Sequence, residues 1–276
     1  MMNFKPQQSL GILVGALVLS SAASAAALSP TETDANKIMS AVEDRDTGDK
    51  GTARMQMTIT DSANRSRTRV VKTRLMKFKG GTKQIMFFES PADVRNTALL
   101  SFDYDAGGKS DDQWLYLPSL RKSTRISSSD KSGAFMGSDL TYADMTSKDP
   151  KDYNYKVVKA SAKVRGEECW LIESKPKTKK EIRETGYLKS LVWVSKSKLL
   201  PLQTKSWVRE GRKLKYTKFG DVRKVDGIWI AHRIVVRTVR GKSVVSTTKL
   251  RFMNYKLNDP DVKAADFTQR RLEKGL

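Results

Sequence analysis

The feature that most constrains this chain is a long succession of short runs in which apolar and polar residues alternate. The first is Met55-Gln56-Met57-Thr58-Ile59, and similar runs continue to Leu257. Because successive side chains of a strand point to opposite faces, this period of two predicts strands that bury one face. Turns of hairpin length, such as Gly80-Gly81 and Asp226-Gly227, separate most of the runs. Neighbouring strands are therefore expected to pair antiparallel.

A helix is predicted before the first of these runs. Ser29-Pro30-Thr31-Glu32 places a capping serine before a proline and has a glutamate three residues on, which is typical of a helix start. Ala35, Ile38, Met39 and Val42 then fall on one face, so an amphipathic helix of about 14 residues is expected before the polar stretch at Asp46. Its apolar face must pack on something apolar.

A polar insertion at residues 127–153 interrupts the succession of strands. It is rich in Gly, Ser and Asp, and Thr141-x-x-Asp144 predicts the cap of a short helix within it. We predict a mainly β (α+β) fold of about 11 to 12 strands, a curled antiparallel sheet that stays unclosed, with the N-terminal helix and the insertion over one face. No internal repeat suggests a second domain, so residues 28–276 are expected to form one.

The N-terminus has the order charged, apolar, small. Lys5 precedes an apolar run at 10–19 and a small-residue stretch at 20–27 that holds Ala-x-Ala twice. This predicts a secretory signal peptide over residues 1–27. The alternative, an uncleaved anchor, would need about 20 apolar residues. The only cysteine, Cys169, is far from the cleavage site and excludes a lipid anchor there, so a soluble periplasmic protein is expected.

The chain is strongly basic, with 52 Lys and Arg against 30 Asp and Glu and a net charge of +22. A basic protein favours anionic partners. In the cytoplasm these would include nucleic acid, but export places the chain among anionic lipid head groups and cell-wall polymers. We therefore predict anionic head groups as partners and no nucleic acid. A solvated strand face explains the same charge equally well.

Catalytic motifs are missing from the sequence. It has one histidine, His232, on a predicted strand, and no nucleophile elbow, zinc-binding helix or phosphate-binding loop. His232 and Cys169 are interpreted as structural residues, and neither an enzyme nor a cofactor is predicted. Carboxylates near Gly107-Gly108 could hold Ca²⁺ or serve an envelope enzyme, but their spacing matches no standard calcium loop and no metal is predicted; they are Asp103, Asp105, Asp111 and Asp112.

Methionine and aromatic residues concentrate in the N-terminal half. Flexible, polarizable Met suits a surface that adapts to irregular apolar ligands, although the same side chains could simply fill a core. We predict that twelve residues line an apolar cavity: Met55, Met57, Met76, Met86, Phe87, Leu100, Phe102, Trp114, Tyr116, Met136, Leu140 and Met145.

Two segments resemble the outer-membrane lipoprotein-sorting (LolA-like) family. They are Asp-Gln-Trp-Leu-Tyr-Leu-Pro-Ser-Leu-Arg-Lys at 112–122 and Met-Gly-Ser-Asp-Leu-Thr-Tyr-Ala-Asp-Met at 136–145, and a looser similarity extends to 261–267. The resemblance implies an unclosed half-barrel whose apolar cavity takes acyl chains. It also implies a periplasmic shuttle for lipoproteins or, in the branch with Trp-Leu-Tyr-Leu-Pro, for lipids handled with an RND-type inner-membrane transporter, which we favour.

The resemblance leaves two questions open. The family's lid-locking arginine could correspond to Arg54, Arg67, Arg69 or Arg74. The alternative function is an envelope sensor or scaffold that uses the same half-barrel to bind a membrane protein. In either case the predicted helix and the insertion at 127–153 are the candidate moving parts.

Overall fold

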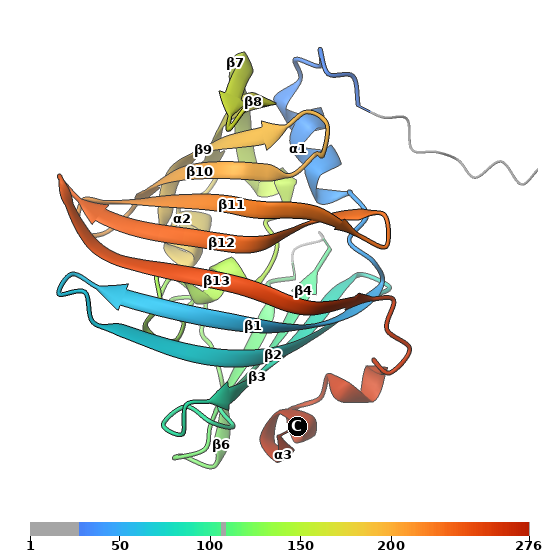
Figure 1. Ribbon diagram of the computed structural model, residues 1–276, viewed down its shortest axis with the longest axis vertical. Helices are drawn as coiled ribbons and strands as arrows, with labels where there is room; N and C mark the ends of the chain where they lie inside the picture. The colour runs from blue at the N-terminus through green and yellow to red at the C-terminus, as the bar shows by residue number, and fades with distance from the viewer. Residues whose placement is uncertain (1–27, 106–108, 276) are drawn as a thin grey trace, which may run out of the picture.

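The computed structural model of the protein describes residues 28–105 and 109–275, so the predicted signal peptide at 1–27 lies outside the described residues. The fold is one antiparallel sheet in the order β6-β5-β4-β3-β2-β1-β13-β12-β11-β10-β9-β8-β7 (Figure 1). Its 13 strands are β1 Lys50–Asp61, β2 Ser66–Phe78, β3 Gly81–Ser90, β4 Ala98–Tyr104, β5 Asp112–Leu117, β6 Lys122–Arg125, β7 Tyr153–Val164, β8 Glu167–Pro176, β9 Tyr187–Ser195, β10 Pro201–Val208, β11 Lys213–Val225, β12 Ile228–Arg240 and β13 Ser243–Leu257.

The predicted mainly β, unclosed half-barrel is confirmed, with 13 strands in place of the predicted 11 to 12. The strand order explains why the sheet has two free edges. β1 pairs with β13 at its centre, while β6 and β7, which are consecutive in the sequence, form the opposite edges. The chain between β6 and β7 must therefore cross from one edge to the other. That connection is the polar insertion.

The sheet has an inner face, toward which it curls around α1 (Ala35–Glu43), α2 (Lys179–Thr185) and the insertion, and an outer face on the other side (Figure 1). Residues directly opposite each other on antiparallel strands share a face. Met57 pairs with Leu250, and both are buried on the inner face beneath the insertion. Arg54 is also on β1, an odd number of residues from Met57, so it points to the opposite side and is exposed on the outer face.

Three of the four apolar clusters in the described residues hold the covering segments on the sheet. The insertion packs on Met57, Phe88 and their neighbours on the inner face. The helix α1 packs farther along the same face, where Ile38 contacts a cluster that includes Trp170 of β8. The C-terminal segment, with η4 (Ala264–Asp266) and α3 (Gln269–Lys274), covers the outer face of β3–β5, and its apolar contacts are Val262, Phe267 and Leu272.

The N-terminal helix begins later than predicted. The side chain of Asp34 accepts hydrogen bonds from the N–H groups of Asn36 and Lys37 and is the N-cap of α1, so the prediction of a start at Ser29 is wrong. The carboxylate of Glu32 accepts instead from the N–H groups of Thr33 and Asp34, which closes a local turn rather than a capping box. Of the predicted helix of about 14 residues, the nine residues Ala35–Glu43 are helical.

The insertion contains three short 3-10 helices, η1 (Phe135–Gly137), η2 (Tyr142–Met145) and η3 (Pro150–Asp152). The predicted cap at Thr141 is confirmed, because Thr141 and Asp144 bond each other's backbone N–H in a capping box. Among the described residues no helix is both long and apolar enough to cross a membrane.

Candidate functional site

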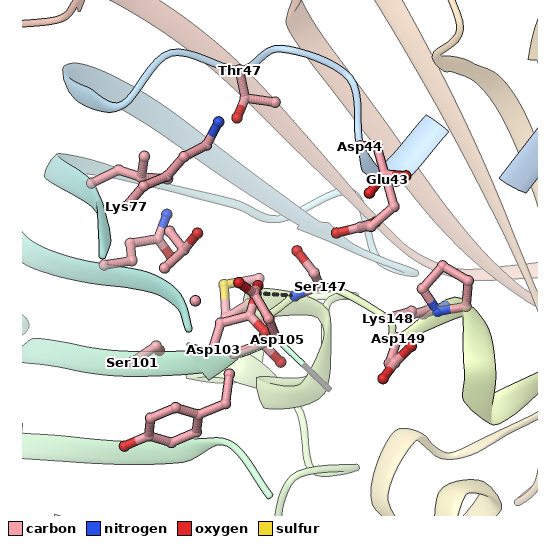
Figure 2. A pocket seen from close by; sticks show the side chains of 18 of the residues that line it. Glu43, Asp44, Thr47, Lys77, Ser101, Asp103, Asp105, Ser147, Lys148 and Asp149 are labelled. Atoms are coloured by element: carbon pink, nitrogen blue, oxygen red, sulfur yellow. Dashed lines mark hydrogen bonds between the residues drawn. The ribbon is translucent and has the colours of Figure 1, made fainter. Parts of the chain in front are cut away.

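A cavity of about 800 Å³ opens on the inner face. The C-terminal end of α1 forms one wall, the ends of β2, β3 and β4 form another, and residues 144–151 of the insertion close the third. Most of the residues that line it are of polar types, and Figure 2 shows Glu43, Lys77, Asp103, Ser147 and Lys148 around the space. Apolar side chains at its edge are Leu75, Phe78 and Met145.

Two carboxyl groups of the cavity have a pKa above the usual value. Burial raises the pKa of Asp103, against a hydrogen bond of 2.7 Å that its Oδ2 accepts from the N–H of Ser147. Burial likewise raises the pKa of Glu43, which the Ser147 side chain partly offsets and the negative charge of Asp103 increases. Ser147 lies between the two carboxyls in Figure 2. Asp103 therefore accepts a proton more readily than an exposed carboxylate does.

A second cavity of about 470 Å³ shares a wall with the first, formed by Asp103, Tyr104 and residues 146–149. It runs toward α2, where Lys180 and Glu181 line it. Burial raises the pKa of Glu181 as well, and the hydroxyl of Tyr153 donates a hydrogen bond of 2.5 Å to its carboxylate. The two cavities together form the mouth of the half-barrel, the opening of its inner face between α1 and α2, and polar groups line one side of it.

The twelve predicted cavity residues lie on both faces of the sheet. Met145 is the one that lines the 800 Å³ cavity. Six belong to or pack against the inner-face cluster under the insertion: Met55, Met57, Met86, Met136, Leu140 and Met145. The other six belong to or pack against the outer-face cluster under the C-terminal segment: Met76, Phe87, Leu100, Phe102, Trp114 and Tyr116. The role of all twelve in ligand binding stays a prediction.

Of the four arginines that could lock a lid, Arg69 is the one that reaches the insertion. It is 7% exposed, donates a hydrogen bond from its guanidinium to the carbonyl oxygen of Met136, and lies 6.0 Å from the Phe88 ring. Burial lowers the pKa of Arg69, so the guanidinium depends on this contact in place of water. The others lie elsewhere: Arg54 pairs with Glu89, Arg74 pairs with Asp266 on the outer face, and Arg67 is exposed.

Asp139 fastens the insertion to the opposite half of the sheet. Its carboxylate is buried and accepts hydrogen bonds from the hydroxyls of Thr238, Ser246 and Thr248, while its backbone N–H donates to the Oγ1 of Thr248 at 2.9 Å. Arg69 lies on β2 and these hydroxyls lie on β12 and β13. The insertion is therefore held from both sides of the β1–β13 centre.

The residues interpreted as structural have structural partners. The Nδ1 of His232 is 3.2 Å from the carbonyl oxygens of Asp221 and Ile230, and its ring packs on Tyr255. Cys169 is fully buried, and burial raises the pKa of its thiol to about 11.

The four aspartates near Gly107-Gly108 are spread over separate contacts. Asp103 and Asp105 line the larger cavity, Asp111 accepts a hydrogen bond from the N–H of Tyr104, and Asp112 pairs with Arg125. Within residues 28–105 and 109–275 no group of three or more His, Cys, Asp or Glu is placed to hold a metal ion.

The polar wall of the cavity and the Asp139 anchor were not among the predicted site residues. A signal for Glu43 existed, because it lies four residues after Met39 on the stripe that docks α1. Asp139 lies between the apolar pair Phe135–Met136 and Leu140, where a lone carboxylate indicates a buried partner. Ser147 and Lys148 carried no such signal.

Comparisons with known proteins place the chain among lipoprotein-sorting proteins. A family model described only as an uncharacterized protein matches residues 80–274, and no curated protein sequence matches. The structure of an outer membrane lipoprotein-sorting protein domain from Vibrio parahaemolyticus aligns with a TM-score of 0.77 at 30% identity, covering 87% of this chain and 98% of that one.

Two further structures agree with this. A DUF1329 family protein from Desulfovibrio piger has a TM-score of 0.78 and 28% identity, covering 86% of this chain and 97% of that one. A LolA superfamily protein from Nitrosomonas europaea has a TM-score of 0.63 at 20% identity, covering 86% and 98%, and supports the fold alone.

Proposed function

Because the chain belongs to the outer-membrane lipoprotein-sorting, LolA-like family, we propose that it is a carrier which holds the acyl chains of lipids or lipoproteins against the inner face of its half-barrel. The observation that carries the proposal is the apolar surface beneath the insertion. Met55, Met57, Phe88 and Leu99 form a continuous cluster there. The insertion that covers it packs Phe135 on Phe88 and is hydrogen-bonded to the sheet, through Arg69 and Asp139 among others.

The energetics of an acyl chain suit this surface. Burying one CH₂ group contributes about 0.8 kcal/mol, so a 16-carbon chain gains on the order of 10 kcal/mol before ordering costs. The acyl chain would replace the side chains of Phe135, Met136 and Leu140, which now cover this apolar surface. Loading and release therefore both require the insertion to move.

The polar cavity beside this surface completes a site for an amphiphile. It adjoins Met145 and Leu75 on one side and offers Lys77, Lys148 and the two carboxyls on the other. An acyl chain under the insertion would then leave its polar end in the cavity, where these lysines and carboxyls can bond it.

The setting of the carrier is the space between two membranes. The predicted signal peptide at 1–27 supports export, and the absence of a cysteine at the predicted cleavage site leaves the product untethered. In the proposal it shuttles its ligand between the membranes and exchanges it with an RND-type inner-membrane transporter. The Trp-Leu-Tyr-Leu-Pro resemblance supports that partner.

The test uses two adjacent leucines on opposite faces of β4. Leu99 is 1% exposed on the inner face and Leu100 is 0% exposed on the outer face, so Leu99→Ala and Leu100→Ala remove the same volume from equally buried sites. Both should destabilise the fold by about 2–5 kcal/mol. Only Leu99→Ala should alter binding of a fluorescent fatty acid. Equal effects on binding would contradict the inner-face site.

Native ligand provides the second test. The protein recovered from the envelope of its own cells should yield stoichiometric lipid when extracted with organic solvent and analysed by mass spectrometry. A ligand-free protein that also refuses added fatty acid and lipopeptide would refute the carrier.

One observation favours the alternative, a sensor or scaffold that binds a membrane protein. The insertion fills the apolar surface, and the cavity that stays open beside it is lined mostly by residues of polar types. A stable complex with a membrane regulator, formed by a protein that carries no lipid, would support that alternative over the carrier.

A further inference from the structure

The outer face of β10–β13 carries positive charge without compensation. β10, β12 and β13 contain no Asp or Glu, and the only acid of β11 is Asp221. The basic residues that point outward are Lys205, Lys218, Arg233, Arg237, Lys249 and Arg251. All but Lys205 are exposed, and within the described chain none of the six forms a salt bridge.

Cross-strand pairing makes this arrangement costly for the fold. Arg233 lies directly opposite Arg251 on β13. Like charges in directly opposite positions destabilise a sheet. A solvated sheet face with no partner usually mixes both signs, which avoids that repulsion. The outward charge therefore points to a partner that is itself anionic.

Aromatic rings lie between these charges. Trp207 is half-buried, with the Nζ of Lys189 4.7 Å and that of Lys205 4.8 Å from its ring centroid. Tyr216 pairs with Arg237 on one neighbouring strand and with Lys205 on the other. Trp and Tyr beside Lys and Arg are typical of a surface that meets the boundary between lipid head groups and acyl chains.

The shape of the face selects among anionic partners. Figure 1 is viewed from this side: β10–β13 cross the front, α2 lies behind them, and the C-terminal helix α3 lies below, over other strands. Single-stranded nucleic acid is usually bound in a basic groove. Here the basic surface is the convex side of the sheet, which can touch a plane.

We propose that the outer face of β10–β13 docks this protein on membranes that contain anionic phospholipid. The outer and inner faces are opposite sides of one sheet, so a docked molecule keeps its mouth, with α1 and the insertion, directed away from that bilayer and open to another partner. This docking uses none of the inner-face residues and stands or falls separately from the carrier function.

Vesicle flotation of the protein recovered from its own cells tests the docking. It should float with phosphatidylcholine vesicles that contain phosphatidylglycerol and remain in solution with phosphatidylcholine alone, and added salt should release it. A basic residue near an anionic surface contributes about fivefold in binding, so the triple variant Lys218→Gln, Arg237→Gln, Lys249→Gln should bind about 100-fold more weakly.

The matched control removes three charges from other parts of the molecule. Lys122 of β6 and Lys179 and Arg183 of α2 are exposed and lie off the outer face of β10–β13. The triple Lys122→Gln, Lys179→Gln, Arg183→Gln has the same net charge as the first variant. It should bind anionic vesicles within about threefold of the unchanged protein. If both triple variants bound anionic vesicles equally weakly, the net charge of the protein alone would explain the binding, and the proposal would be overturned.

Two further measurements decide the partner. The tryptophan fluorescence of the unchanged protein should shift to shorter wavelength when anionic vesicles are added. Trp207→Phe should lose part of that shift while binding persists, because Trp193 of β9 lies on the same face. Vesicle binding by the unchanged protein without any shift would refute contact by this face. Failure to bind anionic vesicles, together with binding of single-stranded RNA that depends on Lys218, Arg237 and Lys249, would assign the face to nucleic acid and refute the membrane.

Discussion

Removal of the Asp139 carboxylate should open the insertion without unfolding the sheet. This side chain is 4% exposed and accepts three hydroxyl hydrogen bonds from β12 and β13. A hydrogen bond to a charged group contributes about 1.5–3 kcal/mol. Three hydroxyls share two oxygens here, and water can solvate them once the insertion lifts. We therefore expect Asp139→Ala to weaken closure by about 3 kcal/mol, less than the sum of the three bonds.

Hydrogen exchange measures this opening at individual amides. The N–H of Phe135 donates to the carbonyl of Leu140 at 2.8 Å, and the N–H of Ala143 donates to that of Lys131 at 2.9 Å. Both bonds lie within the insertion, and Phe135 and Ala143 are buried while it is closed, so these amides exchange faster when it lifts from the sheet. A loss of about 3 kcal/mol corresponds to about 100-fold faster exchange at these amides. Amides of β9–β11 should keep their protection, because their ladder does not involve Asp139.

A control variant lies in the same insertion. Asp130 is exposed, and its carboxylate accepts a hydrogen bond from the hydroxyl of Ser127 rather than from the sheet. Asp130→Ala should leave exchange at Phe135 and Ala143 unchanged. The reasoning is refuted if Asp139→Ala leaves these amides within about threefold of the unchanged protein, or if the amides of β9–β11 accelerate equally, which would indicate global unfolding.

The other predictions concern the second anchor, the acidic cavity and the buried thiol. Arg69→Met should speed uptake of a fluorescent fatty acid in stopped-flow mixing, because the carbonyl of Met136 loses its donor; slower uptake would contradict this. A raised pKa of Asp103 makes the folded state bind a proton more readily than the unfolded state, so this group lends stability as pH falls from neutral toward about 4 and withdraws it as pH rises. Asp103→Asn should therefore raise the free energy of unfolding in urea at about pH 7 more than at about pH 5. Cys169, with its pKa raised to about 11, should react with a maleimide only in denaturant; rapid labelling of the native protein would show that β8 opens.

The strands could be predicted because their signals are local. Alternation of period two and turn residues within a few positions define each strand and hairpin, and Met55, Met57 and Ile59 are buried as that pattern requires. The prediction of where α1 starts was wrong because Ser29 and Asp34 are both good capping residues. The choice between them depends on where Ile38 must meet Trp170, which is distant in the sequence.

The face of each apolar residue could not be predicted by the same means. In β4, Ala98, Leu99, Leu100 and Ser101 are all buried, because the insertion lies over one side and the C-terminal segment over the other. An apolar run without alternation does indicate cover on both faces. It does not say which cover is movable. The twelve predicted residues were therefore divided evenly between two layers that the sequence alone presents as one.

Because the insertion joins the two edge strands, it can lift from the inner face but cannot leave it. Closure and an acyl chain then compete for Met57, Phe88 and Leu99, and the apparent affinity is the intrinsic affinity multiplied by the open fraction. If the carrier proposal holds, Asp139→Ala should tighten fatty-acid binding in proportion to the increase in exchange, up to about 100-fold. Faster exchange with unchanged affinity would mean that the ligand occupies the polar cavity without displacing the insertion.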